Sequence, residues 1–443
     1  MNQAFLDYYR CPGHFADFSY VNGQHRNGHL GYFCFGSDLI CYGSAVQGRR
    51  EVDGHLPDVS SQVRIEGSTC LLPFDPTEIA NNFRWERYVS INQKPAWKKL
   101  IRDAYYYLRP ALPVSVRRRL QRTWLRGRDK STFPGWPVDR TVDRMLEKLM
   151  FFSIQAHKGS EIPFIWFWPD GKSSCAIMTH DVETAAGLEF AGQLMDINDS
   201  FGIKSSFQII PEERYSAGET ALSAIRLRGF EINVHDLKHD GHLFDDYNQF
   251  LQAAARINQY AKRFGSKGFR SGVLYRNLDW YEAFSFSYDM SVPNNGRLDP
   301  QPGGCCTVMP YFVGEVLELP VTTTQDYALF NILGTHSLDL WREQIRQIMR
   351  QHGLISFIVH PDYLNTQKAN NSYSGLLAHL AALRSNEGLW IALPGEVDSW
   401  WRHRSQMKLV EDNDKWRIEG SGAERGRVAY ATIADNKVVY RIS

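Results

Sequence analysis

Short apolar runs recur along the second half of the chain, and stretches with helical spacing separate them. Two of these stretches, residues 250–264 and 340–349, place their apolar side chains on one helical face. A strand followed by a helix, repeated, is typical of parallel strands joined by crossover helices, so the pattern predicts an α/β fold with a (β/α) barrel. The runs cover residues 175–179, 206–210, 230–234, 268–271, 286–291, 316–320, 354–359 and 389–393.

Shorter segments flank the expected barrel, which spans residues 165–400. Residues 1–90 contain strand-like runs at 30–44 and 63–73, broken by Gly and Asp, which predict a small β-rich unit. Residues 91–164 are expected to form a basic connecting region that ends in a helix at 139–157, with Thr141 as its cap. Runs at 407–418 and 428–442 predict a C-terminal β appendage over residues 401–443.

Composition and charge narrow the class of protein. Hydrophobic residues make up 43% of the chain and charged residues 22%, which is typical of a globular protein with a sizeable core. The 50 Lys and Arg balance 49 Asp and Glu, so the chain has no overall field that would hold nucleic acid. The segment from Met1 to Tyr9 lacks the apolar core of a secretory signal, and we expect a cytoplasmic protein.

The cysteines and the basic region have plain interpretations. The 7 cysteines form an odd set without a C-x-x-C pair, which argues against a disulfide framework and a cysteine zinc site.

Residues 97–128 interleave Lys and Arg with aromatic residues such as Trp124. This segment is either a solvated helix face or a docking surface for a membrane or a lipid-linked glycan carrier.

Acidic and histidine residues follow two of the predicted strands. The first strand leads into Thr179-His180-Asp181-Val182-Glu183, and the third leads into His235 and His239. Two imidazoles four residues apart lie on one face of a helical turn, close enough to bind one ion. With a carboxylate from the first strand they make a two-His, one-carboxylate set that leaves positions open for water. His242 lies beyond Gly241 and is left out of this set.

An arginine and a late histidine complete the predicted site. Arg270 ends the fourth strand, and His360 follows the seventh. Each alone has a structural interpretation, as a salt bridge or a capped loop. Because the carboxyl ends of all strands of such a barrel meet at one mouth, we expect both side chains to face the metal set.

Together these motifs resemble the polysaccharide deacetylase family, also called the NodB-homology or carbohydrate esterase family 4. The resemblance covers roughly residues 165–395 and rests on Thr-His-Asp-Val-Glu, Glu-Ile-Asn-Val-His-Asp-Leu-Lys-His, Gly-Phe-Arg-Ser and the apolar strand into His360. It implies a distorted (β/α) barrel that binds a divalent metal ion, zinc being the favoured one. The roles that it implies are metal binding for Glu183, His235 and His239, and catalysis for Asp181 as base, Arg270 as the group that orients it, and His360 as acid.

The chain departs from the family pattern in three places. The first motif is Asp-x-Glu rather than adjacent aspartates, a form that resembles a minority branch. Gly272 replaces the usual proline after the arginine, which predicts a looser loop around the backbone amide of Val273, the expected oxyanion donor. Asp289, at the end of the fifth strand, is the candidate support for His360.

The resemblance implies an enzyme that removes acetyl groups, N-acetyl groups in particular, from a sugar or glycan. Water activated by the metal would attack the carbonyl, Asp181 would take its proton, and His360 would protonate the leaving nitrogen. Two alternatives stay open, a barrel that binds a glycan without cleaving it and a metal-dependent hydrolase of cyclic amides or imides, because fold alone does not decide the substrate.

Overall fold

The computed structural model describes residues 1–21, 29–45, 48–52, 54–89, 133–413 and 415–443, so the basic segment at 97–128 lies outside the described residues. The chain forms two compact units. One consists of Met1–Tyr88, Asp139–Ser173 and Ser399–Ser443, and the other of Val89–Val138 and Ser174–Asp398. This grouping differs from the four consecutive segments expected from the sequence, because segments far apart along the chain pair with one another.

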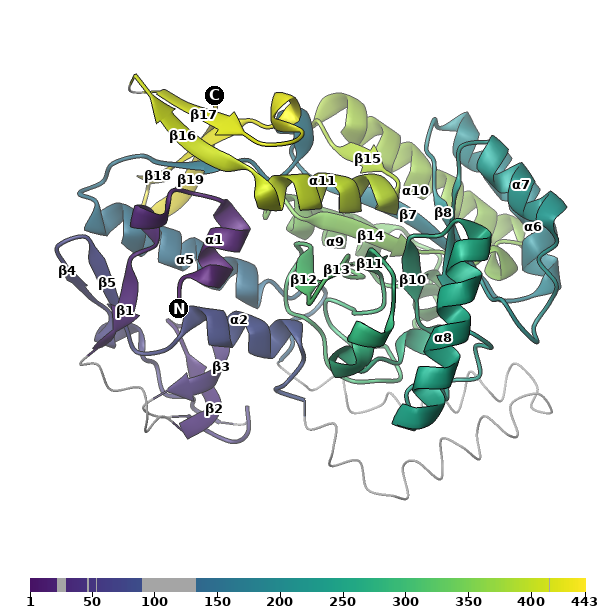
Figure 1. Ribbon diagram of the computed structural model, residues 1–443, viewed down its shortest axis with the longest axis horizontal. Helices are drawn as coiled ribbons and strands as arrows, with labels where there is room; N and C mark the ends of the chain where they lie inside the picture. Colours follow the sequence, from purple (N-terminus) through teal and green to yellow (C-terminus); the bar gives the residue numbers. More distant parts are fainter. Residues whose placement is uncertain (22–28, 46–47, 53, 90–132, 414) are drawn as a thin grey trace. The chain divides into compact units, whose positions relative to one another are not determined.

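The second unit is built around a nine-stranded sheet in the order β12-β13-β11-β10-β9-β8-β7-β14, with β15 also pairing with β7 (Figure 1). Its pairings are parallel except that of β12 with β13. The expected strands are all present, and β12 is an addition. The strands are β7 (Cys175–Val182), β8 (Ser206–Ile209), β9 (Glu231–His235), β10 (Gly268–Arg270), β11 (Tyr288–Asp289), β12 (Tyr311–Val313), β13 (Val316–Glu318), β14 (Leu354–Ile358) and β15 (Trp390–Ala392).

The sheet curls into an open barrel whose gap is bridged by side chains. β13 and β14 are not ladder neighbours. Beyond β13, the hydroxyls of Thr322 and Thr323 donate to the carbonyls of Leu354 and Ser356, each at 2.7 Å, and the amide of Thr323 donates to Ser356 O at 3.3 Å. The distorted (β/α) barrel predicted from the sequence is confirmed by this arrangement.

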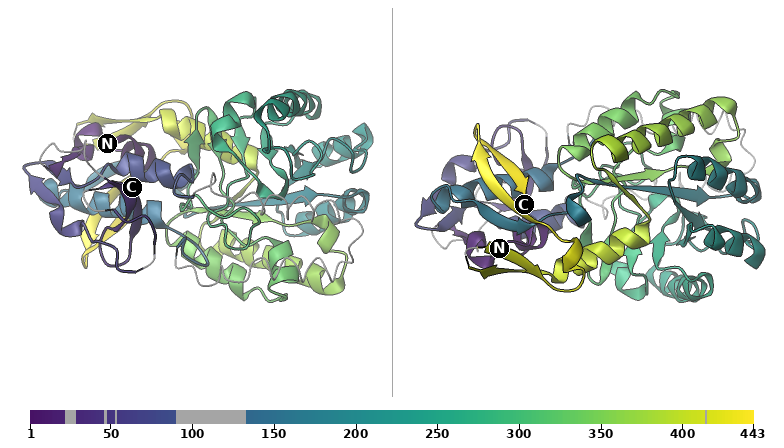
Figure 2. Two further views of the ribbon diagram at one scale, coloured as in Figure 1. Left: turned by 90° about the horizontal axis from the view of Figure 1, so that it is seen from below. Right: turned by 90° about the horizontal axis from the view of Figure 1, so that it is seen from above.

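Helices lie on both sides of the strands of this unit (Figure 2). The first-turn amides of a helix have no carbonyl partner within the helix, and in several helices the side chain just before the first turn accepts from one of them. Thr184, Asp246 and Thr366 have this role in α6, α8 and α10. The helices expected at 250–264 and 340–349 are confirmed as α8 and α9. The helices are α6 (Ala185–Ser200), α7 (Glu219–Leu227), α8 (Tyr247–Phe264), α9 (Asp339–Met349) and α10 (Gln367–Asn386), and α11 (Pro394–Gln406) follows.

The first unit combines small sheets with α-helices, and most of α11 belongs to it as well. The expected β-type runs at both ends of the chain are present as strands, and β18 pairs with β6, which joins the C-terminal hairpin to the middle of the chain. Its elements are α1 (Gln3–Tyr9), β1 (Phe18–Tyr20), β2 (His29–Cys34), β3 (Ile40–Ala45), β4 (Arg64–Glu66), β5 (Thr69–Leu72), α2 (Pro76–Arg84), α5 (Thr141–Ala156), β6 (Ile162–Ile165), β16 (Lys408–Asp412), β17 (Lys415–Glu419), β18 (Val428–Ala434) and β19 (Lys437–Ile442).

Two details of the first unit show what holds it together. The predicted helix at 139–157 is confirmed as α5, but Thr141 is its first residue and not its cap; the capping position is Arg140, whose side chain makes no capping bond, and Asp139 Oδ1 accepts from the amide of Thr141 at 2.8 Å. The buried guanidinium of Arg404 donates to the carbonyls of Tyr8 and Ile165, at 2.8 and 2.7 Å. One cation thus joins α1, β6 and α11 through backbone groups that would otherwise be unpaired.

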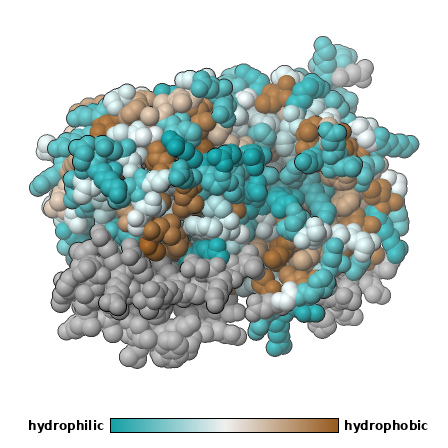
Figure 3. Space-filling model, turned by 180° about the vertical axis from the view of Figure 1, so that it is seen from behind, coloured by the Kyte–Doolittle hydropathy of each residue, from teal (hydrophilic) through white to brown (hydrophobic). Residues whose placement is uncertain are grey.

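Apolar and polar residues alternate over the surface drawn in Figure 3, as on most globular proteins. Leu227, 87% exposed, is the most exposed of the large apolar side chains in the described part of the chain. Within that part, none of the helices combines the length and the apolar character that crossing a membrane requires.

Candidate metal centre

The predicted site residues lie at the carboxyl ends of the barrel strands. Asp181 is the second-last residue of β7 and Glu183 the first residue beyond it. His235 ends β9 and Arg270 ends β10, while His360 follows β14 by two residues. Because these strands are parallel, their ends meet at one edge of the sheet, and residues far apart in sequence converge there.

The three predicted metal ligands form a cluster. Among the described residues, one potential ligand atom from each of Glu183, His235 and His239 lies within 4.8 Å of the others. His239 Nε2 is 3.2 Å from Glu183 Oε1, and the two imidazole centroids are 4.7 Å apart. One carboxylate and two imidazoles at this spacing suit a single divalent ion such as Zn²⁺.

The histidines converge by a different route from the one expected. The sequence predicted a helical turn, but residues 236–242 are not helical. Instead, Asp236 and His239 both have left-handed backbone, with φ of 58° and 56°. This conformation is uncommon for residues other than glycine, and it folds the loop so that His239 returns towards His235. The three predicted ligands lie close together, but the helical turn expected to bring the two histidines together is absent from residues 236–242.

His235 is prepared as a neutral ligand. Its Nδ1 is 3.1 Å from the carbonyl oxygen of Arg270, to which it can only donate a proton. Burial lowers the pKa of His235 to about 4, so the other nitrogen, Nε2, carries a lone pair. Nε2 is buried and has no hydrogen-bond partner in the structure. A buried acceptor without a partner is costly, and a metal ion would satisfy it, so the residues fit the ion.

His239 and Glu183 form an ion pair. Burial alone would lower the pKa of His239, but the Glu183 carboxylate outweighs it and raises that pKa. In the same way, burial opposes ionisation of Glu183, yet its histidine neighbours, His239 foremost, hold its pKa well below the usual range. A metal ion would therefore take the place of a proton at this pair.

Asp181 is held ionised beside the cluster by Arg270. Burial would raise the pKa of Asp181, but the guanidinium, whose Nη1 is 2.6 Å from Asp181 Oδ1, outweighs burial and lowers it. Arg270 is fully buried and also donates to Thr179 Oγ1 at 2.7 Å and to Met290 O at 2.9 Å. The other carboxylate oxygen of Asp181 lies 3.7 Å from His235 Nε2. A fixed, charged base thus faces the ligand cluster.

His360 lies on the other side of the cluster and is supported by Asp326. Asp326 Oδ1 is 2.6 Å from His360 Nδ1, and Asp326 Oδ2 accepts from the amide of His360 at 2.8 Å. Burial would lower the pKa of His360, but Asp326 and then Glu183 outweigh it and raise the pKa to about 10. With Nδ1 bonded to Asp326, the second N–H of the imidazolium, on Nε2, faces Glu183 Oε1 at 3.7 Å.

Asp289, the support for His360 proposed from the sequence, does not have this role. Its carboxylate accepts from Tyr281 Oη at 3.0 Å and from Ser291 Oγ at 2.7 Å. It lies beside Glu318, whose Oε1 accepts from the amide of Val292 at 3.0 Å. Burial, followed by the charge of Asp289, raises the pKa of Glu318 well above its usual range. These two acids belong to the interior of the sheet.

Gly272 does not loosen its loop, as the sequence had suggested. The residue is buried, and its amide donates to Asp236 Oδ2 at 3.0 Å. A Cβ at this position would lie 2.3 Å from Asp236 Oδ2 and 3.1 Å from His239 Cδ2. The glycine therefore allows the loops after β9 and β10 to approach each other. The next residue, Val273, has a φ of 59°, a strained conformation for a β-branched residue.

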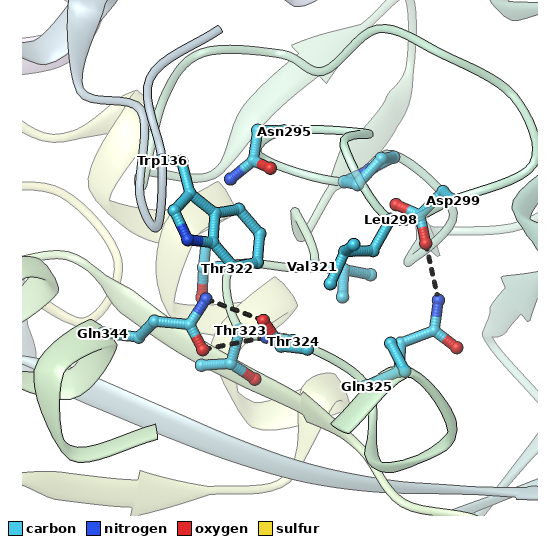
Figure 4. A pocket seen from close by; sticks show the side chains of 12 residues that line it. Trp136, Asn295, Leu298, Asp299, Val321, Thr322, Thr323, Thr324, Gln325 and Gln344 are labelled. Carbon is cyan, nitrogen blue, oxygen red and sulfur yellow. Dashed lines mark hydrogen bonds between the residues drawn. The ribbon is translucent and has the colours of Figure 1, made fainter. Parts of the chain in front are cut away.

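The residues that directly precede Asp326 line a small cavity (Figure 4). It is lined by the segment before Asp326 together with side chains such as Trp136 and has a volume of about 30 Å³, room for a water molecule rather than a sugar. Gln325 Nε2 donates to Asp299 Oδ1 at 3.0 Å, and Gln344 Oε1 accepts from the amide of Thr324 at 3.0 Å. These bonds fix the two residues that precede Asp326.

The structure thus brings together all six residues predicted for the site and adds Asp326, which the sequence reasoning missed. Asp326 follows the sixth predicted strand, a position that marks it as a candidate acid at the mouth but does not distinguish it from Asp289. His242, left out of the ligand set, pairs instead with Asp245 at 2.9 Å. The fold and these side chains define a candidate mononuclear metal centre at the mouth of an open (β/α) barrel.

No family model matches the sequence, and no curated protein matches it. Solved structures do. A Mycobacterium smegmatis protein assigned as a polysaccharide deacetylase is 18% identical, with coverage of 54% of this chain and 93% of that chain and a TM-score of 0.44. Puue allantoinase is 14% identical (53% and 92% covered, TM-score 0.41), and a Pseudomonas aeruginosa PAO1 protein assigned as a polysaccharide deacetylase is 13% identical (53% and 93%, TM-score 0.41).

The matched structures thus include polysaccharide deacetylases, the family that the sequence motifs resemble.

Proposed function

We propose that the chain is a metal-dependent hydrolase that removes N-acetyl groups from a sugar or glycan. The observation that carries the proposal is that Asp181 and His360, on either side of the three-ligand cluster, each have a dedicated buried partner of opposite charge. Arg270 is 2.6 Å from Asp181, and Asp326 is 2.6 Å from His360. One partner favours an ionised acceptor and the other a protonated donor, which is the pair that amide hydrolysis requires.

Each residue has a role that follows from its contacts. Glu183, His235 and His239 would hold the metal ion, which supplies Lewis-acid polarisation of the substrate carbonyl and activation of water near neutral pH. Asp181 accepts the proton that the attacking water loses. His360 donates its Nε2 proton to the leaving nitrogen, so that an amide and water become a carboxylic acid and an amine.

Of the two alternatives from the sequence, the non-catalytic barrel has lost its main support, while the cyclic amide hydrolase fits the same site. The glycan-binding barrel without catalysis depended on a loose loop at Gly272, and that glycine is buried and hydrogen-bonded. A cyclic amide hydrolase would use the same metal ligands and the same base. The substrate therefore separates the deacetylase from this alternative, and only an assay decides between them.

Acetate release from N-acetylated oligosaccharides by zinc-loaded protein is the test. We expect release by the wild type and a loss of about a hundred- to ten-thousand-fold in Asp181→Asn and in His360→Ala. Ring opening of a cyclic imide is measured in parallel with the same samples. Imide hydrolysis without acetate release would replace the deacetylase proposal, and binding of the oligosaccharide without either product would favour the binding barrel.

A further inference from the structure

The peptide group that joins Val182 to Glu183 is held at both ends by side chains from other loops. Tyr215, in the loop after β8, donates its hydroxyl proton to Val182 O at 2.7 Å. Asp362, in the loop after β14, accepts from the amide of Glu183 through Oδ2 at 3.3 Å. Since β7 ends at Val182, Glu183 lies where the sheet stops fixing the backbone, and these two side chains take over that task.

Both side chains are themselves oriented. The Tyr215 hydroxyl accepts from the amide of Ile210 at 3.0 Å, so its own proton points towards Val182 O. Asp362 Oδ1 accepts from the hydroxyl of Thr184, and that hydroxyl accepts from the amide of Gly187 at 3.1 Å, where it caps α6. The clamp is therefore tied to β8 on one side and to the first turn of α6 on the other.

Asp362 also connects the two chemical halves of the site. It lies in the single turn Pro361–Tyr363 that directly follows His360. Glu183 Oε1 and His360 Nε2 are 3.7 Å apart. The Asp362 carboxylate thus accepts a hydrogen bond from the backbone of Glu183, and Asp362 itself belongs to the loop that carries His360, the proposed acid.

The sequence of α6 makes room for this carboxylate. A Cβ at Gly187 would lie 2.5 Å from Asp362 Oδ2 and 2.9 Å from its Cγ. Gly192, in the same helix, would have open space around a Cβ. Glycine costs about 0.5–1 kcal/mol relative to alanine inside a helix, so a contact that only glycine permits accounts for its presence at position 187.

We propose that Tyr215 and Asp362, here called the Glu183 clamp, are positioning residues that set the direction of the Glu183 side chain and so preorganise the metal site. Glutamate has one more rotatable bond than aspartate, and the Glu183 side chain is 18% exposed, so the packing around it leaves freedom that its backbone must limit. The inference rests on the proposed function only in that Glu183 binds a metal ion.

Zinc affinity of the full chain, measured by competition with a chromogenic chelator, tests the clamp. Residues that orient a ligand typically contribute about ten- to a hundredfold to metal affinity, and we expect a loss of that size in Asp362→Ala. Asp362→Asn should retain most of the affinity, because its amide oxygen can accept from Glu183 and its NH₂ can donate to Thr184. Tyr215→Phe should weaken binding, and the double variant should lose less than the sum of the single losses.

Gly187→Ala displaces Asp362 without removing it, and Gly192→Ala is its matched control in the same helix. We expect weaker zinc binding in the first and wild-type binding in the second, with altered visible absorption of the cobalt-substituted protein in the first only. Circular dichroism confirms that each variant is folded. If the wild type binds zinc and both Asp362→Ala and Tyr215→Phe bind it equally well, the clamp is refuted. If the wild type binds no metal ion, the metal-dependent function is refuted as well.

Discussion

Replacement of Gly272 by proline, the residue that the family pattern places there, should lower the stability of this protein and its zinc affinity. The backbone before it is not the obstacle, because Ser271 has φ −73° and ψ 148°, a conformation that a following proline accepts. The obstacles are local. Proline has no N–H to donate to Asp236 Oδ2, and its Cβ would lie 2.3 Å from that oxygen.

The size of the effect follows from these two contacts. Overpacking of a buried site costs about 1–3 kcal/mol. A buried acceptor that loses its donor costs about 1–3 kcal/mol more. Gly272→Ala keeps the N–H and should show only the first cost, while Gly272→Pro should show both, about 2–6 kcal/mol in total. Since the same Cβ would meet His239 Cδ2 at 3.1 Å, both variants should also bind zinc more weakly.

Urea unfolding of the metal-free variants gives the stability, and chelator competition gives the zinc affinity. Gly192→Ala is the control for adding a methyl group at a glycine with space around it. A Gly272→Pro protein that is as stable as the wild type and binds zinc as tightly would refute the reasoning, since it would show that neither the hydrogen bond nor the close approach matters.

Three further predictions concern metal binding and protonation. His235→Ala and His239→Ala should lose their zinc, while Asp181→Asn and His360→Ala should retain it. Equal zinc content in all four purified variants, measured by metal analysis, would contradict this. Zinc binding near neutral pH should release a proton from His239, because its pKa is raised. The heat of zinc binding measured by calorimetry should therefore differ between buffers of different ionisation enthalpy, and equal heats would count against proton release. Glu318 keeps a proton in the folded state that it loses on unfolding above its ordinary pKa of 4.5, so its contribution to stability falls as pH rises. Relative to the wild type, Glu318→Gln should therefore gain unfolding free energy as the pH rises above the ordinary pKa of 4.5, by at most about 1.4 kcal/mol per pH unit, measured by urea unfolding, and a constant difference would rule this out.

Periodicity was sufficient to locate the barrel strands, because buried parallel strands appear as short apolar runs wherever they pair. The rule that such strands end at one mouth placed these polar residues together, and the family resemblance assigned their roles. The conformation of the loop after His235 could not be predicted, since left-handed backbone at Asp236 and His239 has no signature like that of glycine.

The partner of His360 was also out of reach. Asp326 and Asp289 both follow strands that end at the mouth, and their spacing along the chain does not rank them. β14 is bridged to the segment that precedes Asp326 through the hydroxyls of Thr322 and Thr323. The choice between the two acids depends on which strands face each other across the gap in the barrel, and that is a property of the closed structure rather than of either motif.

The topology of the first unit limits the order in which its strands can pair during synthesis. Its sheet β19-β18-β6 takes two strands from the last residues of the chain and one from Ile162–Ile165. On a ribosome, the barrel residues Ser174–Asp398 emerge as an uninterrupted stretch before β18 exists, while β6 must wait with an open edge. The β6 edge can therefore be paired only after β18 has been synthesised, so the first unit is completed last even though it contains the first residues of the sequence.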